Sequence, residues 1–471
     1  MPTTSQPQRK PDIAPPPRPT LLRTITGYGM MAILAIAGFF IVRYFGQGLV
    51  AAHPAAELPG AGKAGHGGGI LPVLVALAAV IALGQILGRI CALVGQPPVI
   101  GEVLAGILLG PSLLGTEFST RILPTESAGY LGLVAQLGVI LYMFLVGLEL
   151  NAEWLRGRAH VAALVSHASI VVPFVMGAVL SLWLYPKLAT DNASFTSFAL
   201  FMGVAMSITA FPVLARILTD QGMARSQLGA LALSCAATDD ATAWCLLAIV
   251  VGLARAEASQ ALLVVAGTIA YIIVMLLAVR PVARRLAWRW NSEQLPRGAV
   301  ALVFVALLTS AAATQWIGIH ALFGAFLLGV VIPHDSPIAQ AFTLQLKNVT
   351  TVLLLPAFFA FTGMRTDIRL LDTPEQWLIC GAIILVATAG KFGGTIAAAR
   401  LTGLGWRESA ALGTLMNTRG LMELIVLNVG LELRVIPPSL FAMMVLMALV
   451  TTVATSPIVR LLVRARRPGT A

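Results

Sequence analysis

Two adjacent aspartates, Asp239 and Asp240, lie inside an apolar stretch that runs from about Leu228 to Leu253. A stretch of this length crosses a bilayer as a helix, because roughly 20 residues rising 1.5 Å each cover a ~30 Å hydrocarbon core. An acid in the middle of a membrane costs on the order of 2.5 to 3.5 kcal/mol even on the more lenient insertion scale. The pair therefore needs a reason, and we interpret it as an ion-binding site.

The two carboxylates cannot be equivalent, since adjacent residues on a helix point about 100° apart. We expect one acid to face the ion and the other to face a neighbouring helix. Two close carboxylates in a low dielectric also raise each other's proton affinity, so a proton and a metal cation compete for one site near neutral pH. Such competition is sufficient for the exchange of a cation against protons.

Three further charges lie within apolar spans. Lys391 can act as a counter-charge that makes the carboxylates tolerable in the membrane, or it can take and release a proton as cations exchange. Both roles pair it with one of the acids. Arg419 and Glu423 are four residues apart, so we expect them to satisfy each other on one helical face as a structural pair.

Two apolar spans carry residues that interrupt a helix. Pro212 follows Thr209 in the middle of the span before the acid pair, where a proline removes a backbone hydrogen bond and clashes with the preceding turn. The later stretch from Asn417 to Gly420 is displaced by 418 − 209 = 209 positions and lies within a similar run. Interrupted helices in matching positions indicate a midplane binding site, because free carbonyls and half-helix ends attract ions. Two ordinary kinks are the alternative interpretation.

The composition predicts the class of protein. The chain has 471 residues, 58% of them hydrophobic and 11% charged, with a mean hydropathy of +0.88. Soluble proteins carry about a quarter charged residues, so this is an integral membrane protein, and recurrent apolar runs predict an all-α polytopic fold. The net charge of +11 does not indicate a nucleic-acid partner, because the basic residues lie in short loops and act as topology signals.

The chain divides into five segments. We expect a disordered cytoplasmic tail at 1–23, an extra N-terminal transmembrane helix at 24–46, a Gly/Ala-rich external linker at 47–69, a transmembrane domain at 70–463 and a basic cytoplasmic tail at 464–471. A cleaved signal sequence is the alternative for 24–46, although the run is long for one. His53 and His66 lack further metal ligands, which favours a plain linker. The cysteines lie in apolar segments and are interpreted as small core residues: Cys91, Cys235, Cys245 and Cys380.

Apolar runs predict thirteen helices after a first one at about Ile25 to Phe45. They are Ile70 to Leu93, Pro98 to Leu113, Gly129 to Leu150, Val161 to Leu184, Phe195 to Leu218, Leu228 to Leu253, Ala261 to Val279, Ala299 to Thr314, Ile319 to Ile332, Val349 to Met364, Trp377 to Ala399, Ser409 to Leu431 and Ser439 to Val463. The resulting even count puts both termini on one side. Arginines concentrate in the alternate connections on that side, which predicts cytoplasmic termini.

Short internal matches indicate an inverted repeat. Phe144 to Glu149 resembles Ala360 to Arg365, and Gly106 to Gly110 resembles Ala325 to Gly329. Seven predicted helices separate the members of each pair, and an odd number gives the two copies opposite orientations. The pattern predicts six plus six helices joined by the segment Ala261 to Val279, an architecture of many secondary transporters.

These motifs together resemble the monovalent cation/proton antiporter superfamily. The resemblance rests on the Thr238-Asp239-Asp240 context, the Thr209-Ala210-Phe211-Pro212 helix and the stretch from Asn417 to Leu424. It is greatest for the second branch, which holds bacterial sodium/proton antiporters, potassium efflux systems and plant cation/proton exchangers. It covers roughly Ile70 to Val463.

The resemblance implies a thirteen-helix fold with a dimerisation domain and a six-helix core in which two broken helices cross, hence a homodimer working by an elevator-like movement. By position it implies that Asp240 is the principal ligand of the cation, Na⁺ or K⁺, and of the proton, and that Asp239 pairs with Lys391. Thr209 would lie at the crossing and Arg419 would be a core charge near the site. The intact acid pair favours electrogenic sodium exchange.

The leading hypothesis is therefore a cation/proton antiporter without cofactors, embedded in lipid in a bacterial inner membrane. Relative to the family, the chain has an extra first helix and lacks a nucleotide-binding regulatory domain or a long soluble tail. Two other hypotheses stay open, a proton-coupled exporter of a small organic cation or metabolite and a non-transporting membrane sensor. An enzyme is not favoured, because the sequence has no Walker motif, zinc spacing or Ser/His/Asp arrangement in a plausible context.

Overall fold

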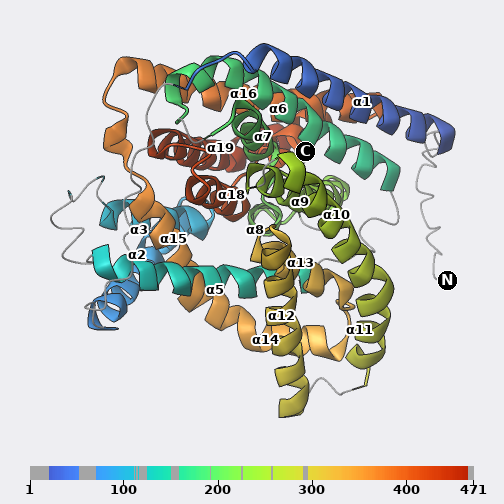
Figure 1. Ribbon diagram of the computed structural model, residues 1–471, viewed down its shortest axis with the longest axis vertical. Helices are drawn as coiled ribbons and strands as arrows, with labels where there is room; N and C mark the ends of the chain where they lie inside the picture. Colours follow the sequence, from blue (N-terminus) through green and yellow to red (C-terminus); the bar gives the residue numbers. More distant parts are fainter. Residues whose placement is uncertain are drawn as a thin grey trace, which may run out of the picture.

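The chain folds into packed helices (Figure 1). The computed structural model describes residues 21–51, 70–110, 112, 115, 125–149, 159–190, 193–223, 226–255, 258–289 and 295–464. Most of the expected N-terminal tail, most of the expected linker with His53 and His66, and the expected C-terminal tail beyond Arg464 lie outside these residues. Within the described part, nine helices are long and apolar enough to cross a membrane, and four shorter apolar helices run over Ile33–Gly46, Pro98–Leu109, Phe195–Ser207 and Ala321–Val331.

The helices follow one another along the whole described chain. Their bounds are α1 (Leu21–Gly46), α2 (Ile70–Leu93), α3 (Pro98–Leu109), α5 (Thr125–Glu149), α6 (Ala159–Leu188), α7 (Phe195–Ser207), α8 (Phe211–Asp220), α9 (Gln227–Arg255), α10 (Ala258–Val274), η2 (Met275–Val279), α11 (Arg280–Ala287), α12 (Arg297–Ile317), α13 (Ala321–Val331), α14 (Pro337–Val349), η3 (Thr350–Leu354), α15 (Leu355–Arg365), η4 (Ile368–Leu370), α16 (Pro374–Leu401), α17 (Trp406–Met416), α18 (Leu421–Glu432) and α19 (Pro438–Arg464).

Most helices differ from their predicted bounds by a few residues, and three of the differences have a local cause. The helix expected over Pro98 to Leu113 ends at Leu109, because Gly110 is extended, with φ −78° and ψ −179°. The helix expected from Val349 begins at Pro337, where Ser336 caps it, and continues through the π-helical turn η3. This added part, α14, carries polar residues that lower its hydropathy, such as Lys347 in its last turn, which pairs with Glu149. The helix expected to end at Val279 continues through η2 and α11.

The N-terminal helix and one cysteine also differ from expectation. Helix α1 starts at Leu21, three residues inside the predicted tail, and packs against α6 and α7. Its Phe39 ring lies 6.1 Å from the ring of Phe174 on α6. All four cysteines are free, and Cys235 and Cys380 are buried as expected, but Cys245 is exposed on α9, so its placement in the core was wrong.

The helices pack in two groups (Figure 1). The α5 bundle consists of α2, α3, α5 and α12 to α15, and the α6 bundle consists of α6 to α9 and α16 to α19. Within the α6 bundle, α6 and α16 pack along each other, and α7 and α17 flank them. The broken spans and the acid pair all belong to the α6 bundle.

Glycines let two pairs of helices in the α5 bundle touch backbone to backbone. A Cβ on Gly147 of α5 would lie 2.3 Å from the carbonyl oxygen of Phe326 and 2.9 Å from the Cα of Gly329, both on α13. A Cβ on Gly363 of α15 would lie 2.4 Å from the carbonyl carbon of Gly106 on α3. The short repeats found in the sequence are therefore the segments at which these helices contact.

Substituting Gly363 by Ala is expected to destabilise the protein by about 1 to 3 kcal/mol, because the added methyl group overlaps backbone atoms that cannot rotate away. Gly381 on α16 is the matched control, since nothing lies within 4 Å of a Cβ there. Gly381→Ala should leave stability unchanged or raise it by about 0.5 to 1 kcal/mol. Thermal unfolding of the two purified variants in one detergent measures the difference, and equal melting temperatures would contradict the close packing.

Candidate functional site

Two interrupted helices cross in the middle of the α6 bundle. Helix α7 ends at Ser207, and α8 starts at Phe211 with Pro212 in its first turn. Helix α17 ends at Met416, and α18 starts after Gly420. The two breaks are joined, since the Ala210 N–H donates to the Thr418 carbonyl at 2.9 Å and the Thr209 hydroxyl oxygen lies 3.0 Å from the Met416 carbonyl oxygen.

Gly420 lets the two breaks approach each other. A Cβ at this position would lie 2.8 Å from Cγ2 of Val213 on α8. Asn417, expected to mark the second break, is buried directly after α17, and its side-chain oxygen has no partner among the described residues. Both interruptions indicated by the sequence are thus present, and they meet.

Two buried, positively charged side chains bond the carbonyl groups that lack helical partners at the end of α7. The guanidinium of Arg419 donates to the carbonyls of Ala205 at 2.9 Å and Met206 at 2.7 Å, and Lys391 Nζ donates to the carbonyl of Ser207. The last carbonyls of a helix lack partners within the helix and carry partial negative charge, which positive groups stabilise. Arg419 and Lys391 therefore hold a helix end inside the bundle in addition to pairing with acids.

The second break is held by a side chain of α19. The Thr452 hydroxyl donates to the Arg419 carbonyl at 2.7 Å and accepts from the Arg419 N–H at 3.0 Å. Arg419 Nη1 lies 3.2 Å from Glu423 Oε2, and both side chains are fully buried. The pair inferred from the four-residue spacing is therefore formed, and Arg419 connects both breaks.

Asp239 is surrounded by donors. Its Oδ1 accepts a hydrogen bond from Ser166 at 2.5 Å, and its Oδ2 accepts from Ser169 at 2.8 Å and Thr209 at 2.7 Å. Lys391 Nζ lies 3.1 Å from Oδ2, and both side chains are fully buried. A buried carboxylate is stable when it is paired and hydrogen-bonded in this way.

Asp240 lies on the same helix with a different environment. Its side chain is 1% exposed, yet neither carboxylate oxygen has a hydrogen-bond partner among the described residues. The backbone of Phe211, at the start of α8, is close enough to interact with it. A buried carboxylate without a partner is stable only as the neutral acid or with a bound cation. Asp240 is therefore suited to hold either a proton or a cation.

Sequence reasoning missed three of these residues. Ser166 and Ser169 on α6 hold Asp239, and Thr452 on α19 holds the second break. The spacing of the two serines, three apart within an apolar run, places both hydroxyls on one helical face and could have indicated them. In the described part of the chain, no group of three or more His, Cys, Asp or Glu residues could hold a resident metal ion.

Comparison with known proteins identifies the family. Residues 73–465 match the transmembrane sodium/hydrogen exchanger family. The Na⁺/H⁺ antiporter NhaS4 of Synechocystis sp. is 43% identical over 83% of this chain and 97% of its own length. The chain belongs to the sodium/hydrogen exchanger family. The exchanger is thus a transmembrane monovalent cation/proton antiporter and not an enzyme.

Other relatives confirm the branch that the sequence motifs indicated. Cation/H⁺ antiporter 20 of Arabidopsis thaliana is 38% identical over 82% of the exchanger, and K⁺/H⁺ antiporter 1 of Saccharomyces cerevisiae is 34% identical over 78%. The exchanger spans less than half of their lengths, 48% and 43%. The sodium proton antiporter MjNhaP1 from Methanocaldococcus jannaschii shares the fold, with a TM-score of 0.60 at 15% identity over 83% of the exchanger and 96% of that chain. An all-helical, multi-pass membrane fold is therefore confirmed.

Proposed function

We propose that the exchanger moves sodium, with potassium as the alternative, against protons at Asp240. The observation that carries this assignment is the contrast between neighbouring acids. Asp239 has four donors, whereas Asp240 is buried with neither oxygen hydrogen-bonded within the described residues. Asp239 then holds Lys391 and the crossing, and Asp240 carries the cation or the proton.

The crossing of the two interrupted helices supports ion binding at Asp240. Helix α8 starts beside Asp240, and a helix start carries partial positive charge that stabilises a carboxylate when its cation has left. The side-chain oxygen of Asn417, which has no partner among the described residues, lies at the other break. Oxygen atoms of this kind are the ligands that hard cations prefer.

We also assign the finer architecture as a proposal. Thirteen core helices would form two inverted repeats of six joined by α10, with α1 as the extra helix. The matched contacts support it, because α5 packs on α13 as α15 packs on α3. Alternating access would then be a movement of the α6 bundle against the α5 bundle, within a homodimer. The arginine-rich alternate connections support placing both termini in the cytoplasm of a bacterial cell. This placement requires each predicted span to cross the membrane once.

The experiment is an ion-flux assay with purified protein in liposomes. Addition of sodium or potassium should drive proton movement between about pH 6 and 9, the range in which such sites titrate. The two cations are compared at clamped and unclamped voltage, which separates selectivity from electrogenicity. If neither cation moved protons, the proposal would fail. Proton-driven uptake of an organic cation would then test the exporter hypothesis, and a cellular phenotype that is unchanged in the Asp240→Asn variant would favour the sensor hypothesis.

A further inference from the structure

Trp244 carries a buried hydrogen-bond donor close to Asp240. Its side chain is 2% exposed, and its indole N–H has no hydrogen-bond partner among the residues that the structure describes. The N–H is the only polar group of the indole, and a buried tryptophan usually finds an acceptor for it. An unpaired buried donor costs stability, because the group has lost its water without gaining a bond. Such a donor indicates an acceptor that it meets in another state of the protein.

Asp240 is the unsatisfied acceptor nearest to Trp244 along the described part of α9. The two residues are four apart, so they lie on one helical face with about 5 to 6 Å between their Cβ atoms. Side chains on a helix lean toward its N-terminus, which brings the indole of Trp244 over the turn that holds Asp240. The donor and the acceptor are both buried, and one water or a rotation of the carboxylate is sufficient to join them.

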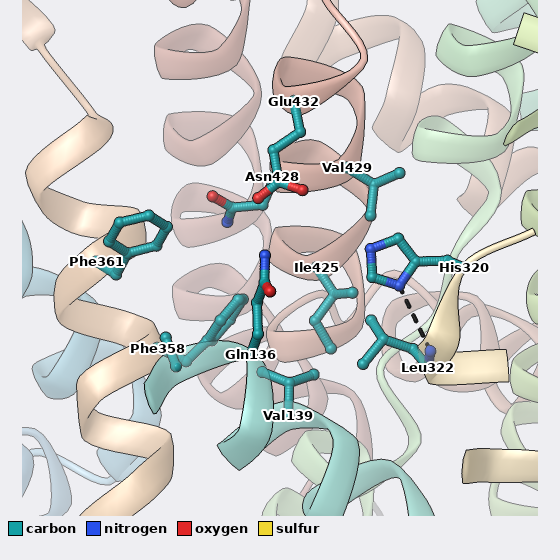
Figure 2. Close-up of a pocket in the computed structure, with 11 residues that line it drawn as sticks. Gln136, Val139, His320, Leu322, Phe358, Phe361, Ile425, Asn428, Val429 and Glu432 are labelled. Carbon is teal, nitrogen blue, oxygen red and sulfur yellow. Dashed lines mark hydrogen bonds between the residues drawn. The ribbon is translucent and has the colours of Figure 1, made fainter. Parts of the chain in front are cut away.

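The ring of Trp244 is held by a residue of the α5 bundle. It stacks on Phe326 of α13, with 6.2 Å between the ring centroids and 29° between the ring planes. Helix α13 is fixed at its start, where the His320 ring accepts the Leu322 N–H, the bond drawn as a dashed line in Figure 2. Further along α13, Gly329 brings its backbone against that of α5. The direction of the indole N–H is therefore set from outside the α6 bundle.

We propose that Trp244 is a positioning residue for Asp240. Its indole N–H bonds the ionised carboxylate, directly or through one water, while the carboxylate holds neither a proton nor a cation. The inference rests on the proposed function, in which each exchange passes through this ion-free form. Without the indole, the ion-free form is a buried charge that the start of α8 at Phe211 compensates alone. Trp244 adds a hydrogen bond to a charged acceptor, which is a strong one.

Other ionisable groups also act on Asp240. Among the described residues they come from α9, α16 and α5: Asp239, Lys391 and Tyr142. Asp239 and Lys391 pair with each other, as do Arg419 and Glu423 at the second break. A substitution at Trp244 leaves all of these groups in place. A changed competition between proton and sodium in such a variant therefore reports the lost indole N–H.

Trp244→Phe removes the N–H and keeps a ring against Phe326. The ion-free carboxylate then becomes less favourable, so proton and sodium both bind more tightly. In liposomes, the KM for sodium at about pH 9 should fall by about three- to tenfold, and kcat should fall because the bound ion leaves more slowly. At about pH 6 the KM should be unchanged, since both ions gain equally and still compete. The pH below which KM rises should move up by about 0.5 to 1 unit, the logarithm of the same factor.

Trp377→Phe is the matched control, because it makes the same change at a half-exposed position on α16. Its KM and kcat should equal those of the unsubstituted protein at every pH. A Trp244→Phe variant with an unaltered KM at alkaline pH, or with a KM changed by one factor at every pH, would overturn the inference. If the unsubstituted protein moved no protons with sodium or potassium, the proposed function would fail instead, so the two failures are distinguishable.

Tryptophan fluorescence tests the same contact without requiring Trp244→Phe to transport. Sodium is added to purified protein in detergent at about pH 9, with choline as the control cation. Sodium should change the emission of the unsubstituted protein and of Trp377→Phe, because the indole of Trp244 loses its carboxylate partner when the cation binds. Asp240→Asn, which keeps the indole and lacks the carboxylate, should show no change, and neither should Trp244→Phe. A sodium-dependent change of equal size in Asp240→Asn would overturn the inference.

Discussion

Asp240→Asn is expected to abolish cation-driven proton movement while the protein remains folded. Asn cannot lose or accept a proton at this position, and its neutral amide binds a cation less well than a carboxylate. Neither oxygen of Asp240 has a hydrogen-bond partner of normal geometry among the described residues, so the substitution alters only the interaction with the backbone at Phe211. Proton flux in liposomes should fall to the level of protein-free vesicles, and the melting temperature in detergent should be unchanged or higher.

Asp239→Asn is the matched control, one residue away on the same helix. It removes the charge that compensates Lys391 and weakens bonds from two serines and Thr209. Breaking a buried ion pair on one side costs about 3 to 5 kcal/mol, so this variant should lose stability, whereas Asp240→Asn should not. The division of roles between the two acids would be contradicted if both variants lost cation binding equally and had equal melting temperatures.

The second large effect is expected at Lys391. Lys391→Met leaves Asp239 buried without its counter-charge and leaves the Ser207 carbonyl without its donor. We expect a loss of about 3 to 5 kcal/mol in the free energy of unfolding. The double variant Asp239→Asn with Lys391→Met should be more stable than the sum of the single effects predicts, because the buried charges are then removed together.

Thermal unfolding of the four proteins of this cycle measures the coupling between the two side chains. A coupling on the order of 1 to 3 kcal/mol is expected for two groups in direct contact within one network. If the stability losses of the two single variants simply added in the double variant, Lys391 would stabilise the protein only through its contact with the end of α7. The variant Lys391→Arg keeps the charge but alters its shape, so it separates charge from geometry.

Much of the fold could be predicted from the sequence. Helix α2 has the predicted bounds, because an apolar run flanked by glycine and proline leaves little choice. The break before α8 was predicted from Pro212, since the consequence of a proline inside a helix is local. Helix α14 was missed because its polar residues lower its hydropathy, and the π-helical turns η2 and η3 were missed because hydropathy does not distinguish a π-helical from an α-helical backbone.

The sequence allowed most residues of the candidate site to be predicted, but few of the contacts between them. Asp239, Lys391 and Arg419 are conspicuous as charges in apolar runs. Which acid Lys391 contacts depends on the rotation of α9 against α6 and α16, and sequence spacing does not supply this angle. The roles of Ser166 and Ser169 were missed for a different reason, since serines in membrane helices usually bond their own backbone.

Proton release on cation binding tests the central claim most directly. Purified protein in weakly buffered detergent solution near neutral pH is titrated with sodium chloride, with choline chloride as the ionic-strength control, while the pH is recorded. In the proposed function, proton and cation compete at Asp240. Sodium should therefore displace protons from the unsubstituted protein and from the folded fraction of Asp239→Asn, and none from Asp240→Asn. Proton release from Asp240→Asn equal to that of the unsubstituted protein would contradict the account.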